Sequence, residues 1–313
     1  MTPRKSRSFR SVLVPLDGSP LAEQAIPLAL EIARAARSKV RLVFVHQSPP
    51  PPFYEESAEL YVAIDLATRK AGRGYLRKLT APLRERSGLP ISAVVIDGSV
   101  PQALAKYVQD SRADLVAMTT HGRGGVRGAW LGSVADHLVR SLDVPVIVTR
   151  AREGAGSLPP PPKIREILVP LDGSPLAEAA LAPAAAVARL FDAELVLVQV
   201  VPPLSPRNLF PDTLTAGYDT EIIALGRKGA QGYLEGLSED LRERGIRVKT
   251  TVVVGHSVGE ALINLAHPER IDLVAIATHG RSGVRRLILG SVADKLIRAA
   301  GPPVLVVRPK KGR

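Results

Sequence analysis

Two glycine-serine pairs, Gly132-Ser133 and Gly290-Ser291, stand at the start of predicted helices and expose bare backbone amides there. The N-terminus of a helix carries amides without internal acceptors and the positive end of the helix dipole, so it attracts anions. Glycine lets an anion approach the backbone, and the serine hydroxyl adds a donor. The surrounding segments, 120–140 and 278–298, are identical at 15 of 21 positions. The sequence therefore predicts two phosphate sites.

A second group of polar residues follows the first predicted strand of each half. Asp17-Gly18 and Asp172-Gly173 come directly after VLVPL and ILVPL. In a parallel sheet the carboxyl ends of the strands share one edge, and ligands bind there where the strand order reverses. We expect Asp17 to lie near the phosphate site, placed for a ribose hydroxyl or a bound cation. The segments match neither GxxxxGK[ST] nor GxGxxG, the common phosphate-binding loops.

An internal repeat organises the chain. VLVPLDGSPLAE at 12–23 returns as ILVPLDGSPLAE at 167–178, with one difference at the first position. REGAGSLPPPPK has the composition of a linker, with glycine and serine before a stiffer proline run. The expected organisation is a basic tail at 1–10, a first domain at 11–151, a linker at 152–163, a second domain at 164–309 and a basic tail at 310–313.

Short runs of β-branched residues alternate with longer segments rich in Ala and Leu in each half, a pattern typical of an α/β doubly wound domain with helices on both faces of a parallel sheet. Ser19 followed by Pro20 marks a helix start. In the first half we expect strands at 11–16, 39–46, 91–96, 113–119 and 144–149, and helices at 20–37, 58–87, 100–111 and 132–141.

Composition restricts the possible functions. The 313 residues contain no cysteine, which excludes disulfides, thiolate metal sites and cysteine nucleophiles and is typical of a reducing compartment. The apolar runs are shorter than the roughly 18 residues that span a bilayer, so we expect a soluble, cytoplasmic protein without a membrane partner. The net charge of +12 is concentrated in two acid-free tails, and aromatic residues make up 4% of the chain, which argues against a nucleic-acid partner. The basic residues of the tails are Arg4, Lys5, Arg7, Arg10, Arg308, Lys310, Lys311 and Arg313.

These motifs resemble those of the universal stress protein family in its tandem form. The resemblance lies in VPLDGS after the first strand, in nine residues between Gly122 and Gly132 and between Gly280 and Gly290, and in the closing VPVIVTR and PPVLVVR. It covers nearly the whole chain apart from the tails and linker. It implies five parallel strands per domain in the order 3-2-1-4-5, with ATP, and Mg²⁺ beside its phosphates, between strands one and four.

The resemblance also implies roles for particular residues. Asp17 and Asp172 would contact the ribose or the metal, Val45 and Val200 would meet adenine through their backbone, and the glycines and serines would surround the phosphates. The implied contacts of the first half are Pro15, Asp17, Gly18, Val45, Thr119, Gly122, Arg123, Gly132, Ser133 and Val134. Those of the second half are Pro170, Asp172, Gly173, Val200, Ala277, Gly280, Arg281, Gly290, Ser291 and Val292.

One motif position departs from the family. Its ATP-binding pattern is Gly-x2-Gly-x9-Gly-Ser/Thr, and the first glycine is Thr119 in one half and Ala277 in the other. A left-handed backbone there would disfavour a β-branched residue such as Thr119 more than Ala277. We therefore expect the second site to be the better nucleotide site.

Each motif also has a structural interpretation. Asp17 and Gly18 could form only the strand-to-helix turn, and the glycine-serine pairs could serve only as helix starts. His121 and His279 are expected to order their loops, because no partner acid or nucleophile is identifiable. The arginines of these loops could contact phosphates or solvent.

Three functional classes follow. The first is an ATP-binding stress or regulatory protein, the second a slow ATPase or phosphotransfer enzyme, and the third a nucleotide-free interaction module. The second lacks a convincing general base or the lysine of a phosphoryl-transfer loop, so we expect a protein that is not primarily an enzyme. The closing strands, 144–149 and 303–308, are apolar edges with few charges, and the family resemblance implies that they pair, giving an internal pseudo-dimer or a homo-oligomer.

Overall fold

The structure is a computed structural model that describes residues 9–48, 58–120, 131–152, 154, 158–161, 163–203, 218–267, 269–278 and 289–309. The chain divides into two compact units, Met1–Pro162 and Lys163–Arg313. None of the helices among the described residues is both long and apolar enough to cross a membrane.

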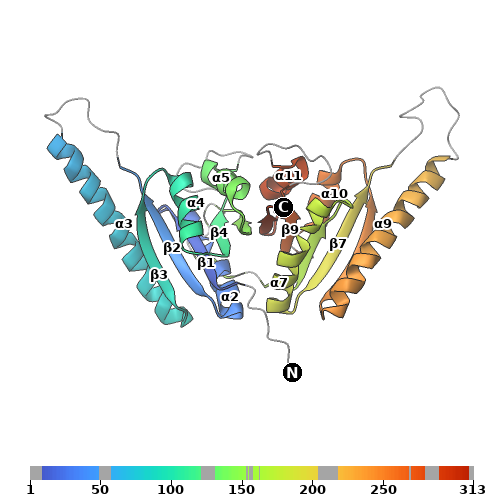
Figure 1. The fold of residues 1–313 in the computed structure, drawn as a ribbon, viewed down its shortest axis with the longest axis horizontal. Coiled ribbons are helices and arrows are strands. Elements are labelled where there is room, and N and C mark those ends of the chain that lie inside the picture. The colour runs from blue at the N-terminus through green and yellow to red at the C-terminus, as the bar shows by residue number, and fades with distance from the viewer. Residues whose placement is uncertain are drawn as a thin grey trace. The chain divides into compact units, whose positions relative to one another are not determined.

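Each unit alternates strands with helices (Figure 1). The first contains β1 (Ser11–Leu16), α1 (Pro20–Glu23), α2 (Ile26–Ala36), β2 (Lys39–His46), α3 (Ala58–Ser87), β3 (Ile91–Asp97), α4 (Val100–Asp110), β4 (Leu115–Thr119), α5 (Ser133–Ser141) and β5 (Val146–Thr149). The second contains β6 (Glu166–Pro170), α6 (Pro175–Glu178), α7 (Leu181–Phe191), β7 (Glu194–Val201), α9 (Tyr218–Glu243), β8 (Arg247–Val254), α10 (Val258–Leu265), β9 (Leu273–Ala277), α11 (Ser291–Ala299) and β10 (Val304–Val307).

All strands within a unit run parallel. The order is β3-β2-β1-β4-β5 in the first unit and β8-β7-β6-β9-β10 in the second, as the family resemblance implies. The inner strands are buried on both faces: every residue of β4 and of β9 is buried. A strand covered on both sides needs helices on both faces, and right-handed crossovers put α2 and α3 on one face and α4 and α5 on the other. The predicted α/β doubly wound fold is confirmed.

One predicted helix is wrong. The helix expected at 20–37 is two helices, because α1 ends at Glu23 and α2 begins at Ile26. Pro27 has no amide hydrogen to donate to the carbonyl of Glu23, so the first helix cannot continue through it. The second unit has the same break between α6 and α7, ahead of Pro183. The predicted cap is confirmed, since Ser19 Oγ accepts a hydrogen bond from the Ala22 amide at 3.2 Å and Pro20 is the first helical residue.

The other predicted elements agree with the structure within two residues at each end. The largest differences are β4 and β5, which begin two residues later than expected. Asp114, expected inside a strand, instead turns its carboxylate toward the start of β1, where it accepts from the amides of Arg10 at 2.8 Å and Ser11 at 3.0 Å. Asp272 does the same for Arg165 at 2.7 Å and Glu166 at 3.1 Å. A carboxylate thus fixes the beginning of the central strand in both units.

We expect Asp272→Ala to destabilise the second unit by about 1–3 kcal/mol, since it leaves the Arg165 and Glu166 amides without their charged acceptor. Urea unfolding followed by circular dichroism measures this. Asp240→Ala, which removes an exposed acid from α9, is the matched control and should change stability by less than about 0.5 kcal/mol. Equal effects of the two substitutions would contradict the proposed role of Asp272.

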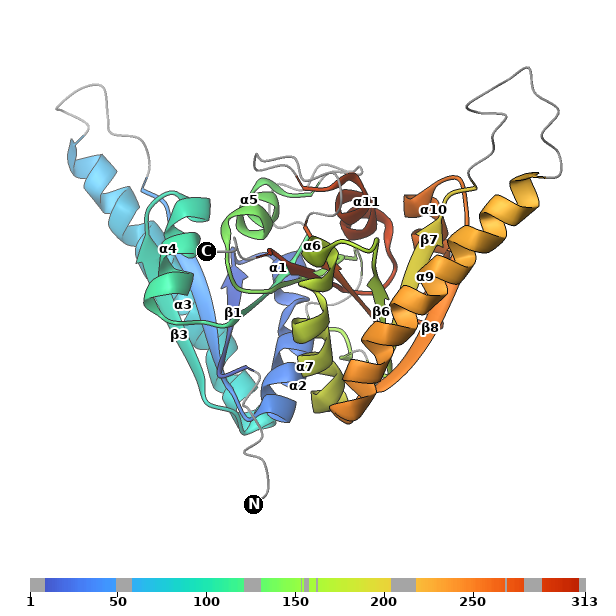
Figure 2. The ribbon, with the colours of Figure 1, turned by 45° about the vertical axis from the view of Figure 1, so that its right-hand side comes forward.

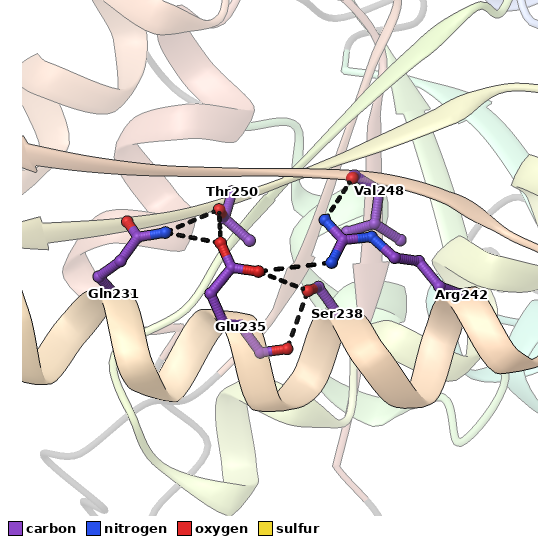
Figure 3. A network of polar contacts seen from close by, with 6 residues as sticks. All are labelled: Gln231, Glu235, Ser238, Arg242, Val248 and Thr250. Carbon is purple, nitrogen blue, oxygen red and sulfur yellow. Dashed lines mark hydrogen bonds and ion pairs between the residues drawn. The ribbon is translucent and has the colours of Figure 1, made fainter.

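In the second unit, α9 lies along β8 and is joined to it by a polar network (Figures 2 and 3). Glu235 Oε1 accepts from Thr250 Oγ1 at 2.7 Å and from Gln231 Nε2 at 2.7 Å. Its Oε2 accepts from Ser238 Oγ at 3.1 Å and from Arg242 Nη1 at 3.4 Å. Hydrogen bonds from Thr250 and then from Ser238 hold the pKa of Glu235 below its ordinary value. The surroundings of Glu235 therefore favour a negative charge.

This network predicts a pH dependence of stability. Because the pKa of Glu235 is lowered on folding, its contribution is complete above the unfolded pKa of about 4.3 and is lost as the pH falls through the folded pKa. Glu235→Gln should therefore lower Tm at neutral pH, and its difference from the wild type should shrink at about pH 3. Thermal melts across this range test it; a difference that stays constant would rule out the ionised carboxylate as its source.

Candidate functional site

The central strand of each unit separates from its neighbour toward the carboxyl end of the sheet. β6 pairs with β9 only at Ile167 and Leu168. The Leu171 amide bonds to Val198 on the other side, at 2.8 Å, so the preceding residue, Pro170, turns its main chain toward β9. Proline has no amide hydrogen, and the ladder cannot continue there. Pro15 has the same place in β1, which pairs with β4 only at two residues.

In the second unit this separation opens into a cavity of about 280 Å³ at the carboxyl ends of the strands. Its volume lies near the lower end of the range for small-molecule sites, roughly 300–1,000 Å³. The lining comes from β6, β7, β9, α6, α10, α11 and the residues after the strands. The lining residues are Pro170, Leu171, Asp172, Ala177, Val198, Val200, Val258, Leu262, Ile276, Ala277, Thr278, Gly290, Ser291, Val292 and Ala293.

Most of the residues implied for the second site lie together in this cavity. Those that line it are Pro170, Asp172, Val200, Ala277, Gly290, Ser291 and Val292. Gly173 is not part of the lining and forms the turn after β6, with φ of 80°. Gly280 and Arg281 fall outside the described residues, as do His279 and Arg285.

The helix start at Gly290 is held against the end of β9. The Gly290 amide donates to the Thr278 carbonyl at 2.8 Å, and the Thr278 amide donates to Val307 on β10 at 2.9 Å. Both ends of the segment between Thr278 and Gly290 are thus tied to the sheet. The first turn of α11 is therefore fixed at the rim of the cavity.

The first amides of α11 are available to a ligand. Gly290 is the N-cap and offers no side-chain acceptor, whereas Ser174 caps α6 through its hydroxyl. Within the described part of the chain, the amides of Ser291, Val292 and Ala293 make no hydrogen bond. Gly290 has φ of −58° and ψ of 145°, which any residue can adopt, so the backbone conformation does not require glycine here. Glycine at this position instead leaves access to the amides.

Asp172 both orders the turn and borders the cavity. Its Oδ1 accepts from the Ser174 amide at 2.9 Å and from Ser174 Oγ at 2.6 Å. Asp17 makes the same two bonds with Ser19, at 2.9 and 2.7 Å, so each aspartate orders the turn after its central strand. Among the described residues, no group of three or more His, Asp or Glu side chains is arranged to hold a metal ion.

The expectation that a left-handed backbone would disfavour Thr119 is wrong. Thr119 ends β4 and Ala277 ends β9, both are buried, and neither has a positive φ. These residues are strand residues, and a strand accepts a β-branched side chain readily. The missing first glycine of the motif therefore imposes no backbone strain in either unit.

The first unit repeats the same main-chain arrangement. The Gly132 amide donates to the Thr120 carbonyl at 2.9 Å, and Gly132 caps α5 with φ of −58° and ψ of 146°. Ser133 is exposed and Val134 is half-buried at the start of α5. Gly18 forms the turn after β1 with φ of 83°, and Val45 is half-buried near the end of β2. The implied contacts at Gly122 and Arg123 fall outside the described residues, as do His121 and Arg127.

Sequence reasoning missed part of the apolar wall of the second cavity. Val258 and Leu262 of α10 line it, and Val198 and Ile276 of the strands lie among them. The available signal was the spacing of four between Val258 and Leu262, which places both on one face of a helix. That spacing alone does not distinguish a core contact from a ligand contact.

A buried histidine distinguishes the first unit at the strand position next to Val45. His46 is 3% exposed, and its Nε2 lies 2.9 Å from Asp65 Oδ1 on α3. A hydrogen bond from Ser48 and then one from His46 hold the pKa of Asp65 below its ordinary value. The corresponding residue of the second unit is Val201, which cannot make this pair. The two units therefore differ in polarity beside the position implied for adenine.

The comparisons with known proteins agree with this architecture. The chain is similar to universal stress protein Rv2005c of Mycobacterium tuberculosis, at 27% identity over 318 residues, covering 97% of this chain and 99% of that protein. It is 33% identical over 148 residues to universal stress protein MJ0531 of Methanocaldococcus jannaschii, covering 47% of this chain and 84% of that protein. A solved universal stress protein from Archaeoglobus fulgidus shares the fold, with a TM-score of 0.64, 18% identity and 97% of both chains covered.

The universal stress protein family itself matches two segments, residues 8–150 and 163–308. These segments contain all the strands and helices that the structure describes in the two units. The chain therefore belongs to the universal stress protein family and carries two copies of its domain.

Proposed function

We propose that the second unit binds ATP in the cavity between β6 and β9 and that the protein acts as a nucleotide-dependent regulator. The observation that carries the proposal is the first turn of α11. Its N-terminus has no side-chain cap, and three of its amides border a cavity of about 280 Å³. Such a helix start stabilises phosphate through directed donors and the helix dipole. The first unit has the same helix start at Gly132 and is proposed to hold a second nucleotide.

The chemistry of the cavity fits the parts of the ligand. The Ser291 hydroxyl and the amides of Ser291 and Val292 would donate hydrogen bonds to phosphate oxygens. Asp172 would accept a hydrogen bond from a ribose hydroxyl or hold a Mg²⁺ ion that also contacts the phosphates. The apolar side chains of Val198 and Ile276 suit an aromatic base. In this proposal the main chain at Val200 recognises the edge of adenine.

A binding role is better supported than turnover. Among the described residues that line the cavity, Asp172 is the ionisable one, and its Oδ1 already accepts two hydrogen bonds from Ser174. A general base must reach the proton that it removes, and a carboxylate engaged in ordering a turn is poorly suited to that role. ATP hydrolysis, if measured, is therefore expected to be slow.

Some solved universal stress proteins are described with a nucleotide, one in complex with cAMP and one from Arabidopsis thaliana with AMP bound. The proposal for this chain rests on its own cavity and helix start. Cytoplasmic location and assembly through the closing strands remain predictions from the sequence.

We expect Gly290→Val to abolish nucleotide binding in the second unit while the fold is retained. A valine side chain would cover the approach to the amides of α11, yet φ of −58° and ψ of 145° are allowed for valine. Losing two hydrogen bonds to a charged group, at about 1.5–3 kcal/mol each, should weaken the affinity for ATP by about 100-fold or more. Titration calorimetry with the full chain in a Gly132→Val background isolates the second site.

The matched single variants Gly132→Val and Gly290→Val should each lower the ATP stoichiometry by the one site of the altered unit. Circular dichroism confirms that each variant is folded. Unchanged stoichiometry and affinity in a folded Gly290→Val protein would contradict the proposed site at the start of α11, and the absence of ATP binding to the wild-type chain would favour the interaction module. Rapid ATP turnover that disappears with Gly290→Val would instead favour the enzyme.

A further inference from the structure

The outer edges of the two units differ in charge at equivalent positions. RKAGRGYL on α3 aligns with RKGAQGYL on α9, so Arg73 takes the place of Gln231 and Arg77 the place of Glu235. The alignment holds in space, because Tyr75 donates to Glu23 and Tyr233 donates to Glu178, both at 2.9 Å. The helices therefore sit on their sheets in the same register.

A shared arginine anchors both edges. Arg84 Nε donates to the Ile91 carbonyl at 2.6 Å, and Arg242 Nη2 donates to the Val248 carbonyl at 3.0 Å. Two residues further along the edge strand, Ala93 stands where the second unit has Thr250, which donates to Glu235. The first unit thus lacks both the carboxylate and one of its donors.

Where the second unit holds the Glu235 carboxylate (Figure 3), the first unit has an open groove of about 510 Å³ between α3 and β3. Arg73, Arg77, Arg84 and Thr80 line it together with Ala93 and Val95, and its lining contains no acid. Arg73 and Arg77 are exposed, and neither forms an ion pair with any residue that the structure describes. The groove is therefore positively charged and suits an anion supplied from outside.

The floor of the groove is an open sheet edge. β3 is the edge strand of its unit, next to β2 alone. The Pro90 carbonyl and the Gly98 amide bond to β2, so by alternation the main chains of Ala93 and Val95 face away from β2. The bond from Arg84 to the Ile91 carbonyl confirms this direction. Main-chain donors and acceptors of β3 are thus available to an added strand.

The spacing of the arginines matches that of an added strand. Arg73 and Arg77 are one helical turn apart, about 6 Å along α3. Alternate side chains on one face of a strand are about 6.6 Å apart. Two acidic side chains separated by one residue in an extended segment could therefore each meet one arginine.

We propose that the groove between α3 and β3 binds an extended acidic segment of a partner protein, which pairs with the edge of β3 and places alternate carboxylates against Arg73 and Arg77. The stand-in for this ligand is the chain's own Glu235, which shows how a carboxylate sits between the helix and the edge strand in the second unit. The groove is separate from the nucleotide site proposed in the same unit, since none of the contacts implied for that site lines the groove.

The test uses the full chain and a fluorescein-labelled peptide, Ser-Val-Glu-Val-Glu-Val-Ser, with its glutamine counterpart as the control ligand. Fluorescence anisotropy should show binding of the glutamate peptide that weakens with added salt. The variant Arg77→Glu with Ala93→Thr rebuilds the second unit's arrangement and should weaken binding by at least about tenfold. Lys78→Glu, an exposed charge change outside the groove, is the matched control and should leave binding unchanged.

Equal binding of the glutamate and glutamine peptides would overturn the proposal, as would an equal loss in Lys78→Glu, because either result would mean nonspecific attraction to a basic protein. Tighter binding of a short oligothymidylate that also depends on Arg77 would overturn it in favour of a nucleic-acid site. Circular dichroism verifies the fold of each variant, and Arg73→Gln provides a second, milder variant expected to weaken binding in the same direction.

Discussion

The absent amide hydrogen of one proline parts the central strand of each domain from its neighbour. Pro170 is the last residue of β6 and Pro15 is the last but one of β1, and at each proline the ladder to the neighbouring β9 or β4 stops and the strands part. The aspartate turn, the apolar wall and the helix start gather around this separation. The bond from Gly290 to Thr278 then fixes the helix amides at its rim. The position of the site thus follows from where a hydrogen-bond ladder cannot continue.

Much of this arrangement was predictable because it depends on local chemistry. The strands at 11–16 and 39–46 were predicted with their observed limits because they are short runs rich in β-branched residues. The long helix at 58–87 was predicted with its observed limits because Gly88 and Pro90 follow it directly. The break before Pro27 was missed because a proline in the first turn of a helix gives no sign of how far an earlier helix continues. Val258 and Leu262 were missed since their role depends on how α10 packs against the sheet.

The residues of the site itself divide in the same way. Seven of the implied contacts of the second unit line one cavity, and four of them are glycine, serine, proline or aspartate, which mark strand and helix ends directly. The concern about Thr119 was wrong because a motif gives residue types and spacing but not φ and ψ. The exchange of Glu235 for Arg77 became meaningful only when Thr250 and Arg242 were seen around the carboxylate. The charge difference is visible because the two repeats place Arg77 and Glu235 at equivalent positions of their helices.

The aspartates that fasten the central strands also bear on how the chain folds during synthesis. Asp114 bonds to the amide of Arg10, which lies 104 residues earlier, and Asp272 bonds to the amide of Arg165, 107 residues earlier. The central strand of each domain therefore gains this contact only after a residue in the last third of that domain has been synthesised. Folding with such distant contacts is slow compared with the formation of single helices. Each domain should consequently complete its central strand only after this aspartate has left the ribosome, and the first can do so while the second is still being made.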